Sequence, residues 1–185
     1  MENKPITINV TVDDVIFRKF AVFDSLFRKR IWVLPLIFAS IMSAFALACF
    51  AMRGNADQAA MIGSVLLVIG LGLPAAHILA FFRSVKTQIK AMGLERPRPV
   101  YSLSLSGEPD GARVTNIDKP AQYEWDGLFG AYRVSGCTYL YVEANKAFLL
   151  PDAQVEEGAE ALWSLLSDML PAEKLHDCRK TKDKQ

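Results

Sequence analysis

The sequence predicts an α+β membrane protein, in which a transmembrane α-helical hairpin is joined to a small antiparallel β domain closed by a C-terminal helix. Two apolar runs, 31–52 and 59–82, with only a short polar segment between them, predict the hairpin. A series of short alternating strands followed by one amphipathic helix predicts the β domain. The expected parts are an N-terminal strand and juxtamembrane helix at 1–30, the hairpin with its helical extension at 31–90, the β domain at 98–171 and a basic tail at 172–185.

The region before the hairpin predicts a short strand and then an amphipathic helix. Residues 6–10 alternate apolar and polar, and the sequence from Thr11 to Asp14 resembles a helix capping box. The apolar residues of the helix fall on one side, at Val12, Ile16, Phe20, Phe23 and Phe27. Two uses of this stripe remain open. It lies at the headgroup level with its apolar side in the lipid, or it packs on the protein's own β domain.

Each apolar run has the length of about 20 residues that a helix needs to cross roughly 30 Å of hydrocarbon. No residue with a fixed charge lies inside either run. Cations gather at the outer ends of the runs, at Arg18, Lys19, Arg28, Lys29, Arg30, Arg83, Lys86 and Lys90. The positive-inside rule therefore places both termini in the cytoplasm, beside the anionic leaflet of the membrane.

Small residues recur at every fourth position in both runs, as they do where helices pack closely in lipid. These candidate packing residues are Ser40, Ala44 and Ala48 in the first run and Gly72, Ala76 and Ala80 in the second, with Ala59 and Gly63 at the same spacing. The pattern predicts that the hairpin closes along these stripes. Whether they also join a second copy of the chain in a homo-oligomer is left open by the sequence.

Pro74 and His77 form a candidate site within the second run. Pro74 removes a backbone hydrogen bond and predicts a bend in the helix. His77 is an ionisable group where charging is costly, which makes it a candidate for function. One interpretation is a gate or proton site. The other is a neutral ring that bonds to a carbonyl freed by Pro74.

The second half of the chain predicts an antiparallel meander of short strands. We expect strands at 100–106, 112–117, 122–125, 131–134, 138–142 and 147–150. Asp152 is the expected N-cap of a last helix that Pro171 ends. The apolar stripe of this helix consists of Val155, Ala159, Leu162, Leu166 and Met169.

Aromatic residues concentrate in this β domain. They are Trp125, Tyr132, Tyr139 and Tyr141, together with Phe148. Such residues form either a hydrophobic core or a groove for a peptide or lipid. A core is the simpler interpretation, because in a small domain each buried ring contributes about 1.5–3 kcal/mol.

Catalytic chemistry is not visible in the sequence. The only histidines are His77 and His176, and neither is placed to activate a nucleophile in the sheet. The three cysteines, Cys49, Cys137 and Cys178, are far apart and lack the spacing of a zinc or redox site. The cations lie mostly beside the apolar runs rather than in a basic stripe with aromatics. We therefore expect no enzymatic activity, no cofactor, no metal and no nucleic-acid partner.

Several segments together resemble a known family. They are Tyr123-Glu-Trp-Asp-Gly-Leu128, Thr138-Tyr-Leu-Tyr-Val142 and Ala147-Phe-Leu-Leu-Pro151, preceded by two apolar spans and followed by an acidic amphipathic helix. This arrangement resembles the bacterial YcxB-like family. The resemblance implies a pleckstrin-homology-like (PH-like) cytosolic domain at a bacterial inner membrane, and it supplies no catalytic residues. Family members tend to carry basic residues just after the proline, whereas this chain has Asp152 and Ala153, which weakens any inference about an anionic ligand there.

Two functions are expected from these observations. The first is a non-enzymatic integral inner-membrane protein whose PH-like domain binds an unidentified protein partner or lipid headgroups. The alternative is a subunit of an oligomeric channel or transporter, assembled through the small-residue stripes. A chain with two spans is too small to form a transport pathway alone, so the alternative requires assembly into an oligomer.

Overall fold

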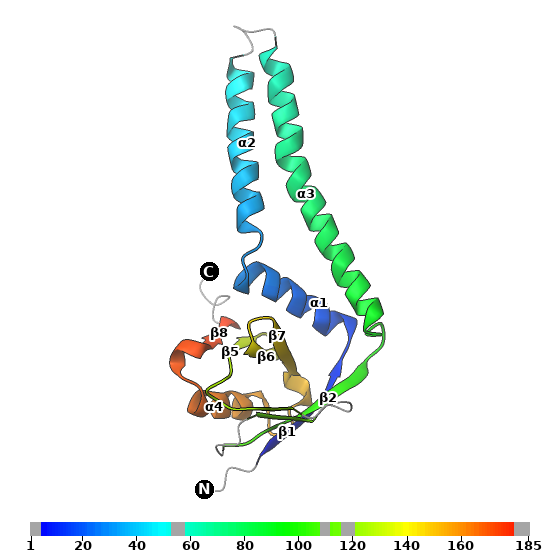
Figure 1. Ribbon diagram of the computed structural model, residues 1–185, viewed down its shortest axis with the longest axis vertical. Helices are drawn as coiled ribbons and strands as arrows, with labels where there is room; N and C mark the ends of the chain where they lie inside the picture. The colour runs from blue at the N-terminus through cyan, green and yellow to red at the C-terminus, as the bar shows by residue number, and fades with distance from the viewer. Residues whose placement is uncertain (1–4, 53–57, 108–111, 116–120, 180–185) are drawn as a thin grey trace. The chain divides into compact units, whose positions relative to one another are not determined.

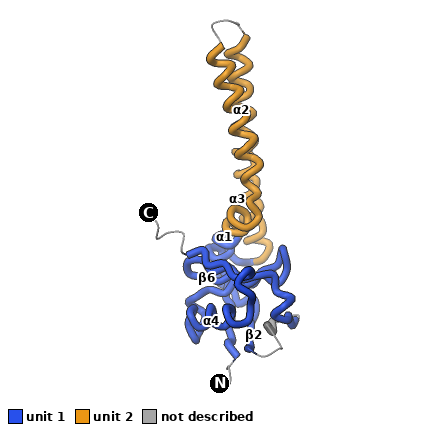
Figure 2. Tube along the Cα trace, turned by 90° about the vertical axis from the view of Figure 1, so that its left-hand side faces the viewer, with its two compact units in different colours: residues 1–20, 93–185 blue, residues 21–92 orange. Residues whose placement is uncertain are grey.

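The computed structural model describes residues 5–52, 58–107, 112–115 and 121–179, with the backbone alone at 112–115. The polar loop of the hairpin, residues 108–111 and 118–120 between the expected strands, the end of the strand expected at 112–117 and the last residues of the tail lie outside the described residues. The chain forms two compact units (Figure 2). We call residues 1–20 and 93–185 the β-rich unit, and residues 21–92 the hairpin unit.

The β-rich unit is assembled from both ends of the chain. Strand β1 (Ile6–Val12) pairs antiparallel with β2 (Arg98–Leu105), and the two lie side by side in Figure 1. The strand expected at 6–10 is therefore confirmed, but it belongs to the β domain rather than to a separate N-terminal part. The chain leaves the sheet at Val12 and returns at Arg98, directly opposite. The hairpin is thus an insertion between two neighbouring strands.

Two four-stranded sheets form the unit. The first has the order β1-β2-β3-β4, with β3 at Ala112–Thr115 and β4 at Ala121–Tyr123. The second has the order β7-β6-β5-β8. Its strands are β5 (Gly130–Val134), β6 (Cys137–Glu143), β7 (Lys146–Pro151) and β8 (Leu175–Asp177). The expected strands are present within the described residues, although β4 ends at Tyr123 and so does not include Trp125. Strand β8, which runs parallel to β5, lies in the segment expected to be a tail.

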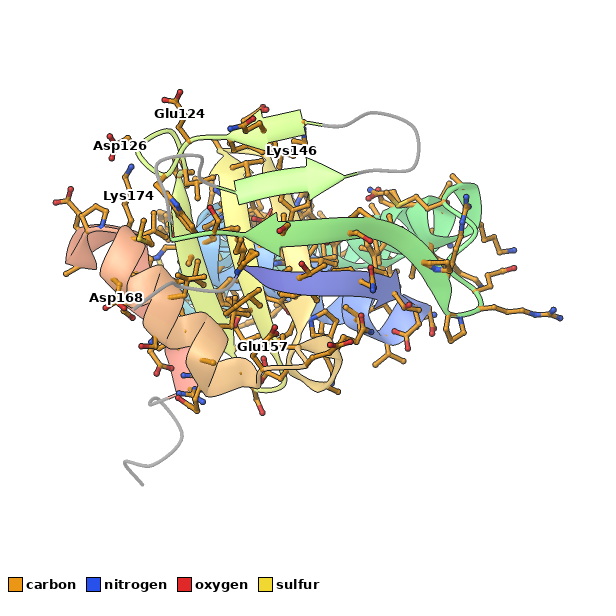
Figure 3. The ribbon with its side chains drawn as sticks, turned by 90° about the horizontal axis from the view of Figure 1, so that it is seen from below. Glu124, Asp126, Lys146, Glu157, Asp168 and Lys174 are labelled. Carbon is orange, nitrogen blue, oxygen red and sulfur yellow. The ribbon has the colours of Figure 1, made fainter. Side chains whose placement is uncertain are left out.

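The strands of the two sheets cross each other, as Figure 3 shows. Tyr101 of β2 joins them: its hydroxyl donates to the Leu149 carbonyl of β7 at 3.0 Å, and its ring meets Phe148 edge-on at 5.0 Å. Trp125 Nε1 donates to the Ser106 carbonyl at 3.1 Å. The fully buried apolar side chains between the elements include Ile8, Leu103, Leu105, Leu128, Leu140, Leu150, Leu162 and Leu166.

Gln154 ties β1 to the segment that follows β7. The Thr11 backbone N–H donates to Gln154 Oε1 at 2.8 Å, and Gln154 Nε2 donates to the Thr11 carbonyl at 2.8 Å. The register of β1 shifts between Val10 and Thr11. At this irregularity the side-chain amide satisfies the backbone groups that a neighbouring strand would otherwise pair.

The last helix begins later than the sequence predicts. Asp152 starts a short 3-10 turn, η2 (Asp152–Gln154), and helix α4 spans Ala159–Met169. The N-cap prediction for Asp152 is therefore wrong. Gly158, with φ of 90°, redirects the chain just before α4, in a conformation that favours glycine. A second 3-10 turn, η3 (Ala172–Lys174), leads into β8, and Lys174 Nζ bonds the Asp126 carbonyl at 2.9 Å (Figure 3).

Helix α1 (Asp14–Phe23) follows β1 and continues into a π-helical segment, η1 (Asp24–Arg28). The cap of α1 is Asp13 rather than Thr11, because Asp13 Oδ1 accepts a hydrogen bond from the Ile16 backbone N–H at 2.8 Å.

The hairpin unit contains two long helices that lie side by side, α2 (Val33–Ala51) and α3 (Ala59–Ala91) (Figure 1). The most apolar window of each has a mean hydropathy of 2.3, and only 6% of that window is buried. By length and composition both helices can cross a membrane. Their apolar side chains face outward, whereas a core helix of a water-soluble protein buries them.

Candidate functional site

The two helices of the hairpin touch at glycines of α3. A Cβ added at Gly70 would lie 2.6 Å from Met42 Cβ, closer than two such atoms can approach. A Cβ added at Gly63 would lie 3.1 Å from the Ala46 carbonyl oxygen and 3.2 Å from Cys49 Cβ. Gly63 and Gly70 are two turns apart and share one face of α3. The close packing of α2 against α3 therefore depends on these two glycines.

The small-residue stripes predicted to close the hairpin do not lie at this contact between α2 and α3. Nothing is within 4 Å of a Cβ added at Gly72. All six candidate packing residues are exposed, namely Ser40, Ala44, Ala48, Gly72, Ala76 and Ala80. The prediction that the hairpin closes along these stripes is wrong, although Gly63 belongs to the contact. Glycine and alanine occur on several faces of α3, and the face that packs is the one where Met42 fits over Gly70.

A groove lies between α2 and α3. Along the hairpin, Gly70 separates this groove from the loop that joins the two helices. The groove has a volume of about 460 Å³ and is lined by Leu34, Pro35, Phe38, Leu73, Pro74 and His77. Figure 1 shows α2 and α3 close together near their loop and further apart toward the start of α2. Pro35 and Phe38 of α2 and Pro74 of α3 are among the side chains that line this space. The predicted site residues Pro74 and His77 thus share one groove.

His77 is exposed and lies against an aromatic side chain. Its ring meets the Trp32 ring edge-on at 5.6 Å, and Trp32 meets Phe81 edge-on at 5.6 Å. No hydrogen bond joins His77 to any residue that the structure describes. The interpretation of a ring bonded to a carbonyl freed by Pro74 is therefore not supported. Function at His77 stays a prediction.

One face of the second sheet is covered by α1. Phe20 of α1 lies 5.2 Å from the Tyr139 ring and 6.2 Å from the Tyr141 ring. Two uses of the apolar stripe were considered, contact with lipid and packing on the β domain. Phe20 packs on the β domain. Tyr139 and Tyr141 are almost fully buried, as is Trp125. These three residues are core and do not line a groove.

Tyr132 is the candidate aromatic residue that stays partly exposed. Its ring stacks on His176 of β8 at 4.5 Å and meets Tyr141 edge-on at 5.3 Å. The pairing of β8 with β5 is further supported by Gly130, where an added Cβ would lie 2.8 Å from the Lys174 carbonyl oxygen. Tyr132 and His176 therefore attach the C-terminal segment to the sheet.

A buried arginine, which sequence reasoning missed, lies on the opposite face of the same sheet. Arg133 of β5 is 1% exposed, and its guanidinium forms a two-pronged ion pair with Glu160 of α4, with one N–O distance of 2.9 Å. The guanidinium also lies 5.5 Å from the Trp163 ring. Arg179 approaches Glu160 at 3.3 Å and pairs with Asp177 at 3.1 Å. This network connects the sheet, α4 and the segment after β8.

The arginines of this network shift the pKa values of the neighbouring carboxyl groups. Hydrogen bonds from Arg133 lower the pKa of Glu160, and a hydrogen bond from Arg179 lowers the pKa of Asp177. Burial raises the pKa of Asp152, whose Oδ1 has no hydrogen-bond partner in the described structure. The Glu160 and Asp177 carboxylates are therefore engaged in ion pairs within the fold, whereas Asp152 is not.

The described residues contain no assembled site for nucleophilic catalysis or for metal binding. Burial, with the nearby charge of Asp152, raises the pKa of the Cys137 thiol to about 12, which makes it a poor nucleophile. Burial also raises the pKa of Tyr139. The described part of the chain contains no group of three histidine, cysteine, aspartate or glutamate side chains that could hold a metal ion.

Comparisons with protein-family models, with curated proteins and with solved structures gave no match to this chain. The resemblance to the YcxB-like family therefore stays a prediction that depends on the segments quoted above. The structure has two features that bear on function: a hairpin with an apolar groove, and a β-rich unit whose paired strands β1 and β2 precede and follow the hairpin in the sequence.

Proposed function

We propose that the chain is a non-enzymatic integral membrane protein that presents a PH-like β domain at the cytoplasmic face of a bacterial inner membrane. There the domain binds a protein partner or lipid headgroups. The observation that carries this proposal is the insertion of the hairpin between β1 and β2, at Val12 and Arg98. Because both ends of the hairpin continue into neighbouring strands of one sheet, a membrane-inserted hairpin would hold the domain by two connections.

The hairpin supports the membrane part of the proposal. Both helices are long and apolar enough to span, and little of their apolar surface is buried. The cations at the outer ends, such as Arg30 and Arg83, favour a topology with both termini in the cytoplasm.

The β-rich unit supports the PH-like part. Two crossed sheets with a helix near the C-terminus are the general plan of a PH-like domain, although β8 adds a strand after that helix. The same region carries the segments that resemble the YcxB-like family.

The alternative function, a subunit of an oligomeric channel or transporter, is favoured by one specific observation. The small-residue stripes are exposed on the hairpin and are not used to close it. In lipid, an exposed stripe of this kind is suited to packing against a helix of another subunit. Loss of ion flux in His77→Ala, together with cross-linked oligomers in mild detergent, would favour this alternative over the adaptor.

Affinity capture of the intact chain from native membranes tests the main proposal. The matched variants are Ile8→Asp, which places a charge in the core between β1 and β2, and Asn9→Asp, which changes the exposed neighbour. A protein or lipid bound by the β domain is captured by the wild type and Asn9→Asp but is lost with Ile8→Asp. A species that Ile8→Asp retains is bound by the hairpin, and capture of no specific species contradicts the proposal.

A further inference from the structure

Three buried side-chain atoms of the β-rich unit have no hydrogen-bond partner among the residues that the structure describes. They are Arg133 Nε of β5, Thr138 Oγ1 of β6 and Asp152 Oδ1, which directly follows β7. Arg133 is 1% exposed, and Thr138 is completely buried. Leaving a buried donor or acceptor unpaired costs free energy, and native proteins contain few such atoms. These three atoms therefore call for a partner that the described side chains do not supply.

The three side chains project from one face of the second sheet. Arg133 is paired directly with Thr138 across β5 and β6, and side chains opposed in this way have Cβ atoms about 4.5–5.5 Å apart. Thr138 is paired in turn with Leu150 of β7. The residue between Leu150 and Asp152 is extended, so both of these side chains point to the same face. The Asp152 backbone N–H donates to the Gly136 carbonyl at 3.1 Å, which keeps Asp152 beside the turn between β5 and β6.

The groups on this face are complementary in hydrogen bonding. Arg133 uses its two terminal nitrogens for Glu160, so the Nε–H is the donor that is left. The Thr138 hydroxyl can both donate and accept, and Asp152 Oδ1 accepts. Burial raises the pKa of Asp152, and the charge of Arg133 opposes this shift, which is consistent with the neighbourhood that the strand register gives.

This set of groups favours a neutral ligand over an ion. A cation would be repelled by Arg133, and an anion would be repelled by Asp152 and Glu160. A water molecule can accept a hydrogen bond from Arg133 Nε, donate one to Asp152 Oδ1 and form a third with the Thr138 hydroxyl. Buried waters in proteins typically form about three hydrogen bonds to polar groups that are otherwise unpaired.

We infer that one buried water molecule is bound between β5, β6 and η2, with hydrogen bonds to Arg133 Nε, Thr138 Oγ1 and Asp152 Oδ1. It connects Asp152, which the ion pairs leave out, to the network around Arg133. The turn η2 also carries Gln154, whose amide bonds to the backbone of β1. The water therefore helps to fix the turn that ties β1 to the second sheet. This inference is independent of the proposed function.

A double-mutant cycle in the full-length protein tests the site. Urea unfolding of the β-rich unit is measured by near-ultraviolet circular dichroism for Thr138→Val, Asp152→Ala and the double variant. Because either substitution disrupts the same water, their combined effect on the unfolding equilibrium constant should be about fivefold smaller than the product of the single effects. Thr138→Ser, which keeps the hydroxyl, is the matched control and should combine additively with Asp152→Ala.

The single variant Thr138→Val gives a second readout. If the hydroxyl is bonded to water, its removal should destabilise the β-rich unit, whereas removal of a hydroxyl without a partner is neutral or stabilising. Thr7→Val, at an exposed position of β1, measures the effect of the substitution alone. A neutral or stabilising Thr138→Val, or an additive cycle with Asp152→Ala, overturns the inference.

A high-resolution crystal structure of the full-length protein identifies the ligand. We expect one water within hydrogen-bond distance of all three atoms. A direct bond between Arg133 Nε and Asp152 Oδ1 that leaves no room for a water overturns the inference. An anomalous signal at this position in crystals grown with bromide also overturns it, because the ligand is then an anion.

Discussion

The hairpin unit and the β-rich unit are both rich in apolar residues, but they use them in opposite ways. In the β-rich unit Ile8, Leu103 and Leu140 are completely buried between the sheets and helices. In the hairpin the apolar side chains point outward, and the helices meet through Gly63 and Gly70. In water, large apolar side chains drive packing, whereas in lipid packing depends on close approach of backbones. The contact residues of the hairpin are therefore of the kind expected where helices pack in lipid, and those of the β-rich unit are of the kind expected in water.

Arginines of the two units also differ in burial and in ion pairing. In the β-rich unit Arg133 is buried and is paired with Glu160, so that its charge serves the fold. In the hairpin unit Arg30 and Arg83 are exposed and have no described ion-pair partner. Buried charges must be paired, whereas exposed charges remain available to a ligand. The ion pair of Arg133 therefore contributes to the stability of the β-rich unit, whereas Arg30 and Arg83 add no ion pair to the described part of the hairpin unit.

The largest expected effect is on the strand that joins the two ends of the chain. Ile8→Asp places an unpaired charge opposite Leu103 and should destabilise the β-rich unit by about 4 kcal/mol or more. Near-ultraviolet circular dichroism and protease resistance of the β-rich unit should both be lost, while the helical signal of the hairpin remains. Asn9→Asp should be close to wild type, because Asn9 is exposed and its side-chain oxygen already accepts a hydrogen bond from Ser102. A protease-resistant β-rich unit in Ile8→Asp would show that β1 is dispensable.

The second expected effect is on the helix contact of the hairpin. A larger side chain at Gly70 must displace Met42, at a cost of about 1–3 kcal/mol, whereas Gly72 has open space around it. A disulfide reports the contact: Gly63→Cys would place its Cβ about as close to Cys49 Cβ as a disulfide requires. Under mild oxidation, peptide mapping should find this bond in the Gly63→Cys protein and with Gly72→Leu added, but much less of it with Gly70→Leu. Equal yields in both double variants would contradict the assigned contact face.

Local patterns in the sequence predicted most elements of both units. The two apolar helices and the strands of the second sheet were found because apolarity and period-two alternation are local signals. The pairing of β1 with β2 was not predicted, since Asn9 and Ser102 are 93 positions apart. Strand β8, with only three residues, is too short to show an alternation. The start of α4 was misplaced because Asp152 has the residue type of an N-cap but Gly158 sets the geometry.

The candidate site was predicted in part, for similar reasons. Proline and histidine inside an apolar run are visible in any sequence, and the structure does bring Pro74 and His77 to one groove. The groove itself depends on Leu34, Pro35 and Phe38 of the other helix, whose registration with α3 no local pattern determines. Arg133 was missed because a single arginine in an alternating strand resembles a solvent-facing residue. Its partner Glu160 comes from a helix elsewhere in the sequence.

A smaller effect is expected where α1 packs on the second sheet. Phe20→Ala removes the ring contacts with Tyr139 and Tyr141 and should lower the free energy of unfolding of the β-rich unit by about 1–2 kcal/mol. Val15→Ala is the control, because Val15 is 50% exposed on the same helix. Urea unfolding followed by near-ultraviolet circular dichroism measures both. A weaker association with vesicles in Phe20→Ala, without a change in stability, would show instead that the stripe lies in lipid.

The smallest expected effect comes from the ion pairs around Arg133, and it depends on pH. The pKa of Glu160 in the folded state is lower than its ordinary value of 4.5, so the pair stabilises the fold above that pH and is lost as the pH falls below it. Asp177 acts in the same direction from 3.8, whereas the raised pKa of Asp152 acts in the opposite direction. Because Glu160 is 79% exposed, water screens much of the pair even though Arg133 is buried.

Glu160→Gln should therefore lower the urea midpoint of unfolding at about pH 7. Between about pH 5 and pH 3, where the wild type loses the ion pair, the midpoint of Glu160→Gln should decrease less with falling pH than that of the wild type. Glu157→Gln is the matched control: Glu157 is also exposed near the start of α4 (Figure 3) and forms no ion pair with any residue that the structure describes, so its profile should run parallel to the wild type. Convergence of Glu160→Gln and the wild type at low pH is the diagnostic result, because protonation removes the same charge as the substitution. Parallel curves for all three proteins would mean that Arg133 is stabilised by Trp163 and its other surroundings rather than by Glu160.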